Sequence, residues 1–185
     1  FPTRRSSDLG QMLHFKRKGA LDADDEGVAL PRERAGAEGE RRGVTVHLVA
    51  AALVALADEL GILLAGPNGQ GVVSTPSSLC AQIVAPYPPV GRIGVASQSG
   101  NFVSSFLNYS RQTGVGISRA VSAGNAAAVT PADYLEWYSH DDATAVSLAY
   151  VEGITDGRSL LDRFASVAAR KPLVVVKGGA TENGA

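Results

Sequence analysis

The chain has 185 residues and a formal net charge of −1, which gives no reason to expect nucleic acid or an anionic membrane as a partner. Hydrophobic residues make up 45% and charged residues 19%, an ordinary balance for a globular protein, and no apolar run approaches the ~20 residues that a membrane-spanning helix needs. The single cysteine, Cys80, excludes an internal disulfide and a thiolate metal cluster, so we expect a cytoplasmic protein, no metal site and a buried Cys80.

The first 47 residues differ in character from the rest. Residues 1–9 resemble the conceptual translation of a short-read sequencing adaptor, and we exclude them from the fold. Residues 10–47 are crowded with Asp, Glu, Arg and Gly from Asp22 onward and keep no regular apolar period. Two interpretations are open: a disordered surface segment, because this composition buries too little apolar surface to offset ordering entropy, or a stretch translated in a shifted reading frame.

A clear pattern begins near residue 48. Leu48–Leu60 is rich in Ala and Leu, and Gly61 follows it, which predicts a helix with a glycine C-cap. We expect a short apolar strand at Ile62–Ala65 and then a turn at Gly66–Gly71. The three prolines within Ala85–Pro89 indicate a linker.

Beyond the linker, expected strands and helices alternate. The strands are Arg92–Ala96, Gly116–Val121, Ala143–Val151 and Pro172–Lys177, and the helices are Asn101–Gln112, one opened by Thr130-Pro131-Ala132-Asp133, and Asp156–Arg170. Such an alternation implies βαβ units with right-handed crossovers and a parallel sheet. The sequence therefore predicts a doubly wound α/β domain.

Two further patterns concern burial in this domain. The apolar runs Val146–Val151 and Leu173–Val176 are typical of strands that are covered on both faces. The last helix is expected to pack through one apolar face, formed by Leu160, Leu161, Phe164, Val167 and Ala168.

In an open parallel sheet, ligands bind at the carboxyl ends of the strands, near the point where the strand order reverses. Four loops are expected there, and all are small, polar or glycine-containing: Ser97–Asn101, Ser122–Asn125, Glu152–Ile154 and Lys177–Gly179. Loops that only connect elements need not all have this composition.

The first of these loops joins a strand directly to a helix, so its amide groups and the helix dipole point at one spot. The hydroxyl groups of Ser97 and Ser99 would add donors, and Gly100 would let the backbone approach a ligand closely. The pattern predicts a cradle for phosphate or another anion. An ordinary N-cap on a tight turn explains the same residues equally well.

Two titratable residues invite a catalytic interpretation. A carboxylate at the end of a buried strand, such as Glu152, is costly to desolvate without a partner, and a role beside an imidazolium would account for it. The alternative is a solvated loop acid. His140 ends the second helix of the domain, on the amino-end side of the sheet, and we interpret it as a surface histidine.

Several motifs together resemble one family, the ADP-forming acetate–CoA ligases, and more distantly the alpha subunit of succinyl-CoA synthetase. The motifs, in the family's order and spacing over roughly residues 50–185, are Gly66-Pro67-Asn68-Gly69-Gln70-Gly71-Val72-Val73, Arg92-Ile93-Gly94-Val95-Ala96-Ser97-Gln98-Ser99-Gly100, Ser122-Ala123-Gly124-Asn125 and Tyr150-Val151-Glu152-Gly153-Ile154. The resemblance implies the end of a Rossmann-like CoA-binding domain at residues 48–84, a linker at 85–91 and a truncated flavodoxin-like ligase domain at 92–185.

The resemblance also implies a reaction, the interconversion of acyl-CoA, phosphate and ADP with free acid, CoA and ATP. An acyl phosphate forms first, and a histidine then carries the phosphoryl group to the nucleotide. CoA and phosphate would bind this chain, whereas ADP or ATP with Mg would require an ATP-grasp domain or a beta subunit that is absent here.

Individual roles follow from the same resemblance. The segment matching Ser97, Gln98, Ser99, Gly100 and Asn101 caps the helix that holds the phosphate, and the acid matching Glu152 hydrogen-bonds the phosphorylated histidine. The turn matching Gly66, Pro67, Asn68 and Gly69 lies near the CoA thiol, and Gly124 and Asn125 belong to a further active-site loop.

The chain departs from the family at two places. Gly69 stands where many relatives have a cysteine, so no thiol role is assigned there. The family's Ser-His-x-Gly segment, which holds the phosphorylated histidine, is not found after the fourth strand, so we do not expect this polypeptide to turn over by itself.

Two other functions remain open. The same pair of domains occurs fused to an acetyltransferase, where it looks like a CoA-binding regulatory module. A flavodoxin or response-regulator domain is the other alternative. The lack of an acidic cluster after the first strand argues against a receiver, and the lack of a Thr/Ser-rich first loop with interleaved aromatics argues against a flavin site.

Overall fold

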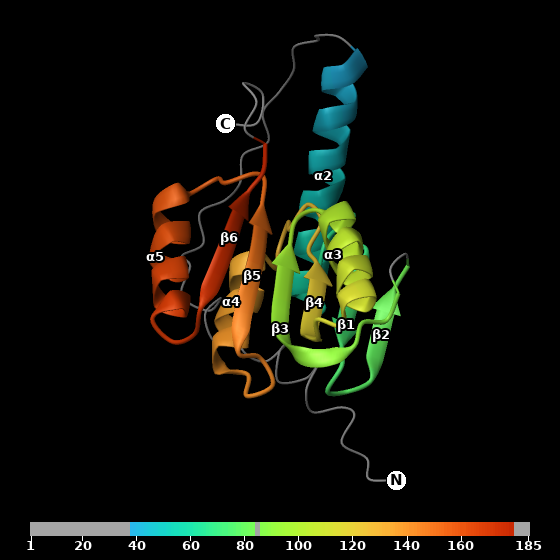
Figure 1. The fold of residues 1–185 in the computed structure, drawn as a ribbon. Coiled ribbons are helices and arrows are strands. Elements are labelled where there is room, and N and C mark those ends of the chain that lie inside the picture. The colour runs from blue at the N-terminus through green and yellow to red at the C-terminus, as the bar shows by residue number, and fades with distance from the viewer. Residues whose placement is uncertain (1–37, 84–85, 180–185) are drawn as a thin grey trace.

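The computed structural model describes residues 38–83 and 86–179, with side chains from residue 48 onward (Figure 1). Residues 1–9, and residues 10–37 of the segment 10–47, lie outside the described residues, whereas residues 38–47 are helical. The helices are α2 (Glu38–Glu59), α3 (Gly100–Thr113), α4 (Pro131–His140) and α5 (Gly157–Ala168). The strands are β1 (Gly71–Ser74), β2 (Leu79–Gln82), β3 (Val90–Ser97), β4 (Ile117–Ser122), β5 (Val146–Val151) and β6 (Leu173–Lys177).

The strands form one six-stranded sheet in the order β2-β1-β4-β3-β5-β6. Strands β3, β4, β5 and β6 are parallel, and their arrows point the same way in Figure 1. Within this parallel part, the first strand lies between the second and the third, which is the flavodoxin-like order. The predicted doubly wound, flavodoxin-like α/β fold is therefore confirmed, and the strand order reverses between β3 and β5.

Helices cover both faces of the sheet. Helix α3 packs on β3 and β4 from one side, whereas α4 packs on β3 and β5, and α5 on β6, from the other (Figure 1). The predicted ends of these helices agree with the structure. Gly114 closes α3 in the left-handed conformation, and Thr130 opens α4 with a capping box completed by Asp133.

The core lies in two layers, one on each face of the sheet. Buried residues on the α3 side are Val73, Val95, Val103, Leu107, Ile117 and Ala120. On the α4 and α5 side they are Ala96, Val121, Ala123, Val129, Ala132, Tyr134, Leu135, Tyr138, Ala149, Val151, Phe164 and Val167. The second layer is the larger one because two helices contribute to it.

The hairpin β1–β2 was not expected from the sequence. Strand β1 pairs antiparallel with β4, with Gly71 opposite Ser122 and Ser74 opposite Arg119. The sheet therefore begins before residues 85–91, the segment interpreted as a linker. The strand expected at Ile62–Ala65 does not form, because only Ala65 makes an isolated bridge, to Val129.

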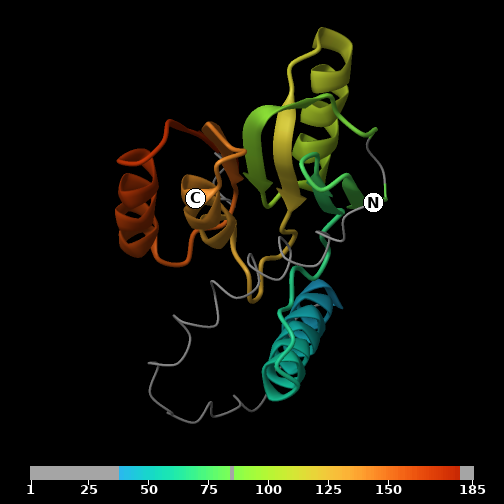
Figure 2. The same cartoon turned by 90° about the horizontal axis from the view of Figure 1, so that it is seen from below.

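Helix α2 begins at Glu38, earlier than the expected start at Leu48, and ends before Gly61, which has a positive φ of 66°. Figure 2 shows that it stands apart from the sheet. Several of its apolar side chains are accordingly exposed, among them Leu48 (52%) and Leu56 (50%). That residues 48–84 form the end of a CoA-binding domain stays a prediction. In the part of the chain that the structure describes, no helix is long and apolar enough to cross a membrane.

Two burial predictions were wrong in part. In α5, Phe164 and Val167 are buried, but Leu161 and Ala168 point to solvent because they lie beyond the narrow stripe that faces the sheet. Strand β6 is not covered on both faces. It is the last strand of the sheet, none of the described helices lies over its α3 side, and its three central valines are exposed: Val174, Val175 and Val176.

Candidate functional site

The loops that follow the parallel strands lie together at the carboxyl ends of these strands, as the parallel topology predicts (Figure 1). This side of the sheet is the ligand edge. Main-chain hydrogen bonds join them. The amide of Ala123 donates to Ser97 O at 2.7 Å, and that of Gln98 donates to Tyr150 O at 3.0 Å. The amide of Gly178 donates to Val151 O at 2.8 Å. The four loops therefore form one continuous polar edge.

The loop Ser97–Asn101 is shaped by its own serines. Ser97 is fully buried, and its hydroxyl accepts from the amide of Ser99 at 3.0 Å and donates to Ser99 O at 2.8 Å. Ser99 is the N-cap of α3, and its hydroxyl accepts from the amide of Phe102 at 3.3 Å. The interpretation of this loop as an ordinary N-cap is therefore correct for Ser99. The groups that this loop leaves for a ligand are the hydroxyl proton of Ser99 and the first amides of α3, those of Gly100 and Asn101, which have no acceptor inside a helix.

The turn Gly66–Gly71 contacts the start of α3 through Gln70. The hydroxyl of Ser104 donates to Gln70 Oε1 at 2.6 Å. A Cβ on Gly100 would lie only 2.5 Å from Gln70 Cδ, so the close approach of this side chain requires a glycine there. The structure therefore brings the turn expected near CoA to the loop expected to hold phosphate.

The same turn packs on the loop that follows β4. The amide of Asn125 donates to Pro67 O at 2.9 Å, and Asn68 Nδ2 donates to Asn125 Oδ1 at 3.3 Å. Gly124 has a φ of +57°, and a Cβ there would overlap the main chain of Asn68. A Cβ on Gly69 would lie 2.5 Å from Ser122 O. These small residues are needed for two loops to touch, which gives Gly69 and Gly124 a packing role.

Ser122 adds a buried polar atom to this edge. It is only 3% exposed and lies in register between Gly71 of β1 and Ser97 of β3. Its hydroxyl has no hydrogen-bond partner among the described residues. Because a buried hydroxyl without a partner is costly, its position at the ligand edge of the sheet fits a place where a small polar ligand binds.

The side chain of Gln98 crosses from the loop after β3 to the loop after β5. Its Oε1 accepts from the amide of Glu152 at 2.6 Å and from the amide of Gly153 at 3.1 Å, and its Nε2 donates to Gly153 O at 3.3 Å. Both ends of the side-chain amide are therefore engaged with the neighbouring loop. Gln98 was expected to be a phosphate ligand, and the structure instead directs its polar atoms toward Glu152 and Gly153.

Glu152 is exposed, which favours the alternative interpretation of a solvated loop acid. Desolvation of the Tyr150 hydroxyl, and then the charge of the nearby Glu152 carboxylate, raises the pKa of Tyr150 above its ordinary value. Lys177 Nζ donates to the main-chain oxygen of Glu152 at 3.0 Å and to Gly178 O at 2.5 Å. The carboxylate of Glu152 is thus solvated, while the main chain of this residue is held by Gln98 and Lys177.

Sequence reasoning missed Tyr150 and Lys177 as neighbours of Glu152. The period of a strand places Tyr150 two residues before Glu152 on the same face, which was a usable signal. The position of Lys177 depends on the pairing of β5 with β6, which puts Val151 opposite Lys177. The ring of Tyr150 also stacks on Phe102 of α3, with centroids 4.6 Å apart.

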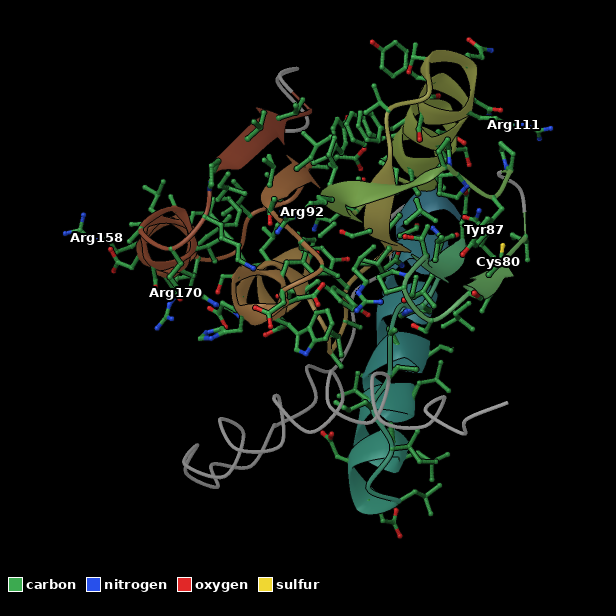
Figure 3. The ribbon with its side chains drawn as sticks, turned by 60° about the horizontal axis from the view of Figure 1, so that its bottom comes forward. Cys80, Tyr87, Arg92, Arg111, Arg158 and Arg170 are labelled. Carbon is green, nitrogen blue, oxygen red and sulfur yellow. The ribbon has the colours of Figure 1, made fainter. Side chains whose placement is uncertain are left out.

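Other candidate residues lie away from this edge. His140 is exposed at the end of α4, on the amino-end side of the sheet. Cys80 is exposed on β2, contrary to the expected burial, and Figure 3 shows it near Tyr87. Arg158 of α5 and Arg170, which follows that helix, point outward (Figure 3). Among the described residues, no group of three or more His, Cys, Asp or Glu side chains is placed to hold a metal ion.

Comparison with known proteins gives consistent matches. The family described as the succinyl-CoA ligase-like flavodoxin domain matches residues 90–185. An ADP-forming acetate–CoA ligase I of Archaeoglobus fulgidus is 43% identical over 133 residues, which cover 72% of this chain and 19% of that protein. The alpha subunit of an ADP-forming acetate–CoA ligase I of Pyrococcus furiosus is 36% identical over 133 residues, which cover 72% of this chain and 29% of the subunit.

A solved structure is similar as well. The dinucleotide-forming acetyl-coenzyme A synthetase 1 of Ca. Korarchaeum cryptofilum, in complex with phosphate and ADP, matches with a TM-score of 0.68 and 35% identity. The match covers 74% of this chain and 30% of that one. The chain therefore spans less than a third of the length of each of these three relatives.

Proposed function

Because the chain belongs to the family of succinyl-CoA ligase-like flavodoxin domains, we propose that it is part of an acid–thiol ligase. The ligase would interconvert acyl-CoA, ADP and phosphate with free acid, CoA and ATP. One structural observation carries the proposal: the side chain of Gln98 joins the loop after β3 to the loop of Glu152 after β5, at the point where the strand order reverses. That point is where ligands of such sheets bind. Gln70 in turn reaches α3 through Ser104.

The start of α3 is the proposed phosphate site. The first amides of the helix, from Gly100 and Asn101, and the helix dipole favour an anion there. The buried, unpartnered hydroxyl of Ser122 lies at the same edge of the sheet and supports a small polar ligand. In this proposal Ser97 acts by shaping the loop, since its hydroxyl both donates and accepts within it. The Ser99 hydroxyl accepts from the amide of Phe102 and keeps its own proton for an anion.

Glu152 is the proposed acid that meets the imidazole carrying the phosphoryl group. Its carboxylate is exposed, so it can be reached, and Gln98 and Lys177 hold its main chain in place. His140 lies on the opposite side of the sheet, so we propose that the imidazole comes from another part of the ligase. ADP or ATP with Mg would be bound by an ATP-grasp domain or a beta subunit.

The turn Gly66–Gly69 is proposed to lie near the thiol end of CoA, because Gln70 joins this turn to the phosphate loop. Gly124 and Asn125 support the turn from the other side. A CoA-binding regulatory module is the alternative function, and no contact in the described residues favours it over a ligase.

The test is nucleotide turnover by the complete ligase that contains this chain, measured with CoA, phosphate and a series of short acids. Glu152→Gln removes the charge that faces the imidazole and is expected to lower kcat by about a hundredfold. Glu59→Gln is the matched control, because Glu59 is exposed at the end of α2. If the wild-type ligase turns over nucleotide with none of the acids, the enzymatic proposal is wrong and a regulatory module is the better one.

A further inference from the structure

The side chain of Gln98 bridges the two loops that flank the reversal of strand order. All three of its side-chain hydrogen bonds go to the main chain of Glu152 and Gly153. From this geometry we infer that Gln98 is a positioning residue: it fixes the main chain after β5 and thereby the direction of the Glu152 carboxylate. The inference rests on the proposed function in one respect, the role of Glu152 in the ligase.

The loop after β5 needs such a bridge. Glu152, Gly153 and Ile154 are all exposed, and a Cβ on Gly153 would meet nothing within 4 Å. Packing therefore does not hold this segment, and glycine is the residue whose backbone is least restricted. The amides of Glu152 and Gly153 are paired only through Gln98 among the hydrogen bonds of the described residues. Without Gln98, these two amides would lose their acceptor, and the hydrogen bond from Lys177 Nζ to Glu152 O would remain.

Gln98 itself stands on a rigid base. Its amide donates to Tyr150 O at 3.0 Å, which ties it to β5 just before the loop that it holds. The preceding residue, Ser97, is fully buried and closes the turn through Ser99. Gln98 therefore fixes the backbone of Glu152 relative to the turn between β3 and α3, where phosphate is proposed to bind.

The chemistry of the bridge requires a glutamine. An acceptor must face two amides while a donor faces Gly153 O, and a carboxamide provides both at one end of the side chain. A glutamate at position 98 would keep the acceptor but set a second oxygen against Gly153 O. A leucine of similar size would remove all three hydrogen bonds.

The experiment compares Gln98→Leu and Gln98→Glu in the complete ligase. Gln98→Leu is expected to lower kcat about tenfold and to leave KM for phosphate and for CoA within about twofold. Gln98→Glu, which keeps the acceptor, is expected to retain more of kcat than Gln98→Leu. Gln112→Leu, an exposed glutamine at the far end of α3, is the matched control and should leave kcat and both KM values unchanged.

Two further readouts separate positioning from a general structural role. Hydrogen–deuterium exchange of the peptide that contains Glu152 and Gly153 should be faster in Gln98→Leu and unchanged in Gln112→Leu. The double variant Gln98→Leu with Glu152→Gln should be little slower than Glu152→Gln alone, because both changes act through one carboxylate.

The inference is overturned if Gln98→Leu leaves the exchange of this peptide unchanged. It is also overturned if the variant raises KM for phosphate at constant kcat, since Gln98 would then be a phosphate ligand. If the wild-type ligase shows no turnover, the proposed function fails, and the exchange comparison alone decides whether Gln98 holds the loop.

Discussion

Lys171 provides a sharp test of how the end of α4 is stabilised. Its side-chain ammonium donates to three main-chain oxygens, those of Tyr138 at 3.0 Å, Asp141 at 2.6 Å and Thr144 at 2.8 Å. The last carbonyl groups of a helix lack partners within the helix, and a lysine side chain is one way to satisfy them. Lys171 precedes β6, so the same contacts also join α4 to the edge of the sheet.

Lys171→Met keeps the length of the side chain and removes the ammonium group. A hydrogen bond to a charged group contributes about 1.5–3 kcal/mol, but here one ammonium serves three carbonyls and is half-buried, so water can replace part of the interaction. We therefore expect the free energy of unfolding to fall by about 2–4 kcal/mol. Urea unfolding followed by the fluorescence of Trp137, the chain's one tryptophan, reports on α4 directly.

Arg170→Met is the matched control, because Arg170 is exposed and points away from the sheet (Figure 3). It should change the free energy of unfolding by less than about 0.5 kcal/mol. The reasoning is refuted if Lys171→Met and Arg170→Met give the same midpoint at equal m-values.

Two other substitutions test the packing of the loops and the burial of a tyrosine. Gly124→Ala should lower the free energy of unfolding by at least about 2 kcal/mol in the same urea assay, because the added Cβ would overlap Asn68. Gly61→Ala is the control, since Gly61 has a similar positive φ but nothing within 4 Å of an added Cβ, and it should lower the free energy of unfolding by only about 1 kcal/mol. Equal losses would contradict the contact with Asn68. Burial, and then the charge of Asp133, raises the pKa of Tyr134 from 10.0 to about 12. Folding therefore favours the protonated tyrosine. Its contribution to the free energy of unfolding is fully present below pH 10 and is lost as the pH rises toward 12. In Tyr134→Phe, the free energy of unfolding should fall less steeply between pH 10 and 12, by up to about 1.4 kcal/mol per pH unit. The same slope in the wild type and the variant would contradict this prediction.

The sequence was sufficient to predict the parallel part of the fold because its signals are local. Thr130 and Asp133 form the expected capping box, and Gly114 ends α3 as a glycine in the left-handed conformation should. The hairpin β1–β2 was not predicted because its strands are only four residues long, too short to show a hydrophobic period. In addition, β1 pairs antiparallel with β4, which is distant in the chain. Exposure of β6 depended likewise on its place at the sheet edge.

Of the candidate site, the sequence predicted which loops lie together but not the direction of the side chains. Ser97 and Ser99 carry the donors that a phosphate cradle would need, yet the donor of Ser97 is used within the turn and the Ser99 hydroxyl serves as the N-cap acceptor. Gln98 was grouped with them because it lies between them. Its contact with Glu152 depends on β3 and β5 being neighbours, which hydrophobic period alone does not determine.

The strand order accounts for both the location of the site and the need for Gln98. After β3 the chain turns to α3 on one face of the sheet, and after β5 it turns to α5 on the other, so the two loops leave neighbouring strands in opposite directions. Main-chain pairing between β3 and β5 ends where Gln98 donates to Tyr150 O. Beyond that point only a side chain can join the loops, and Gln98 does so at 2.6 Å from the amide of the one acid in the Glu152–Ile154 loop. The divergence that exposes Glu152 therefore also makes its position depend on two side chains, Gln98 from the loop after β3 and Lys177 from the end of β6.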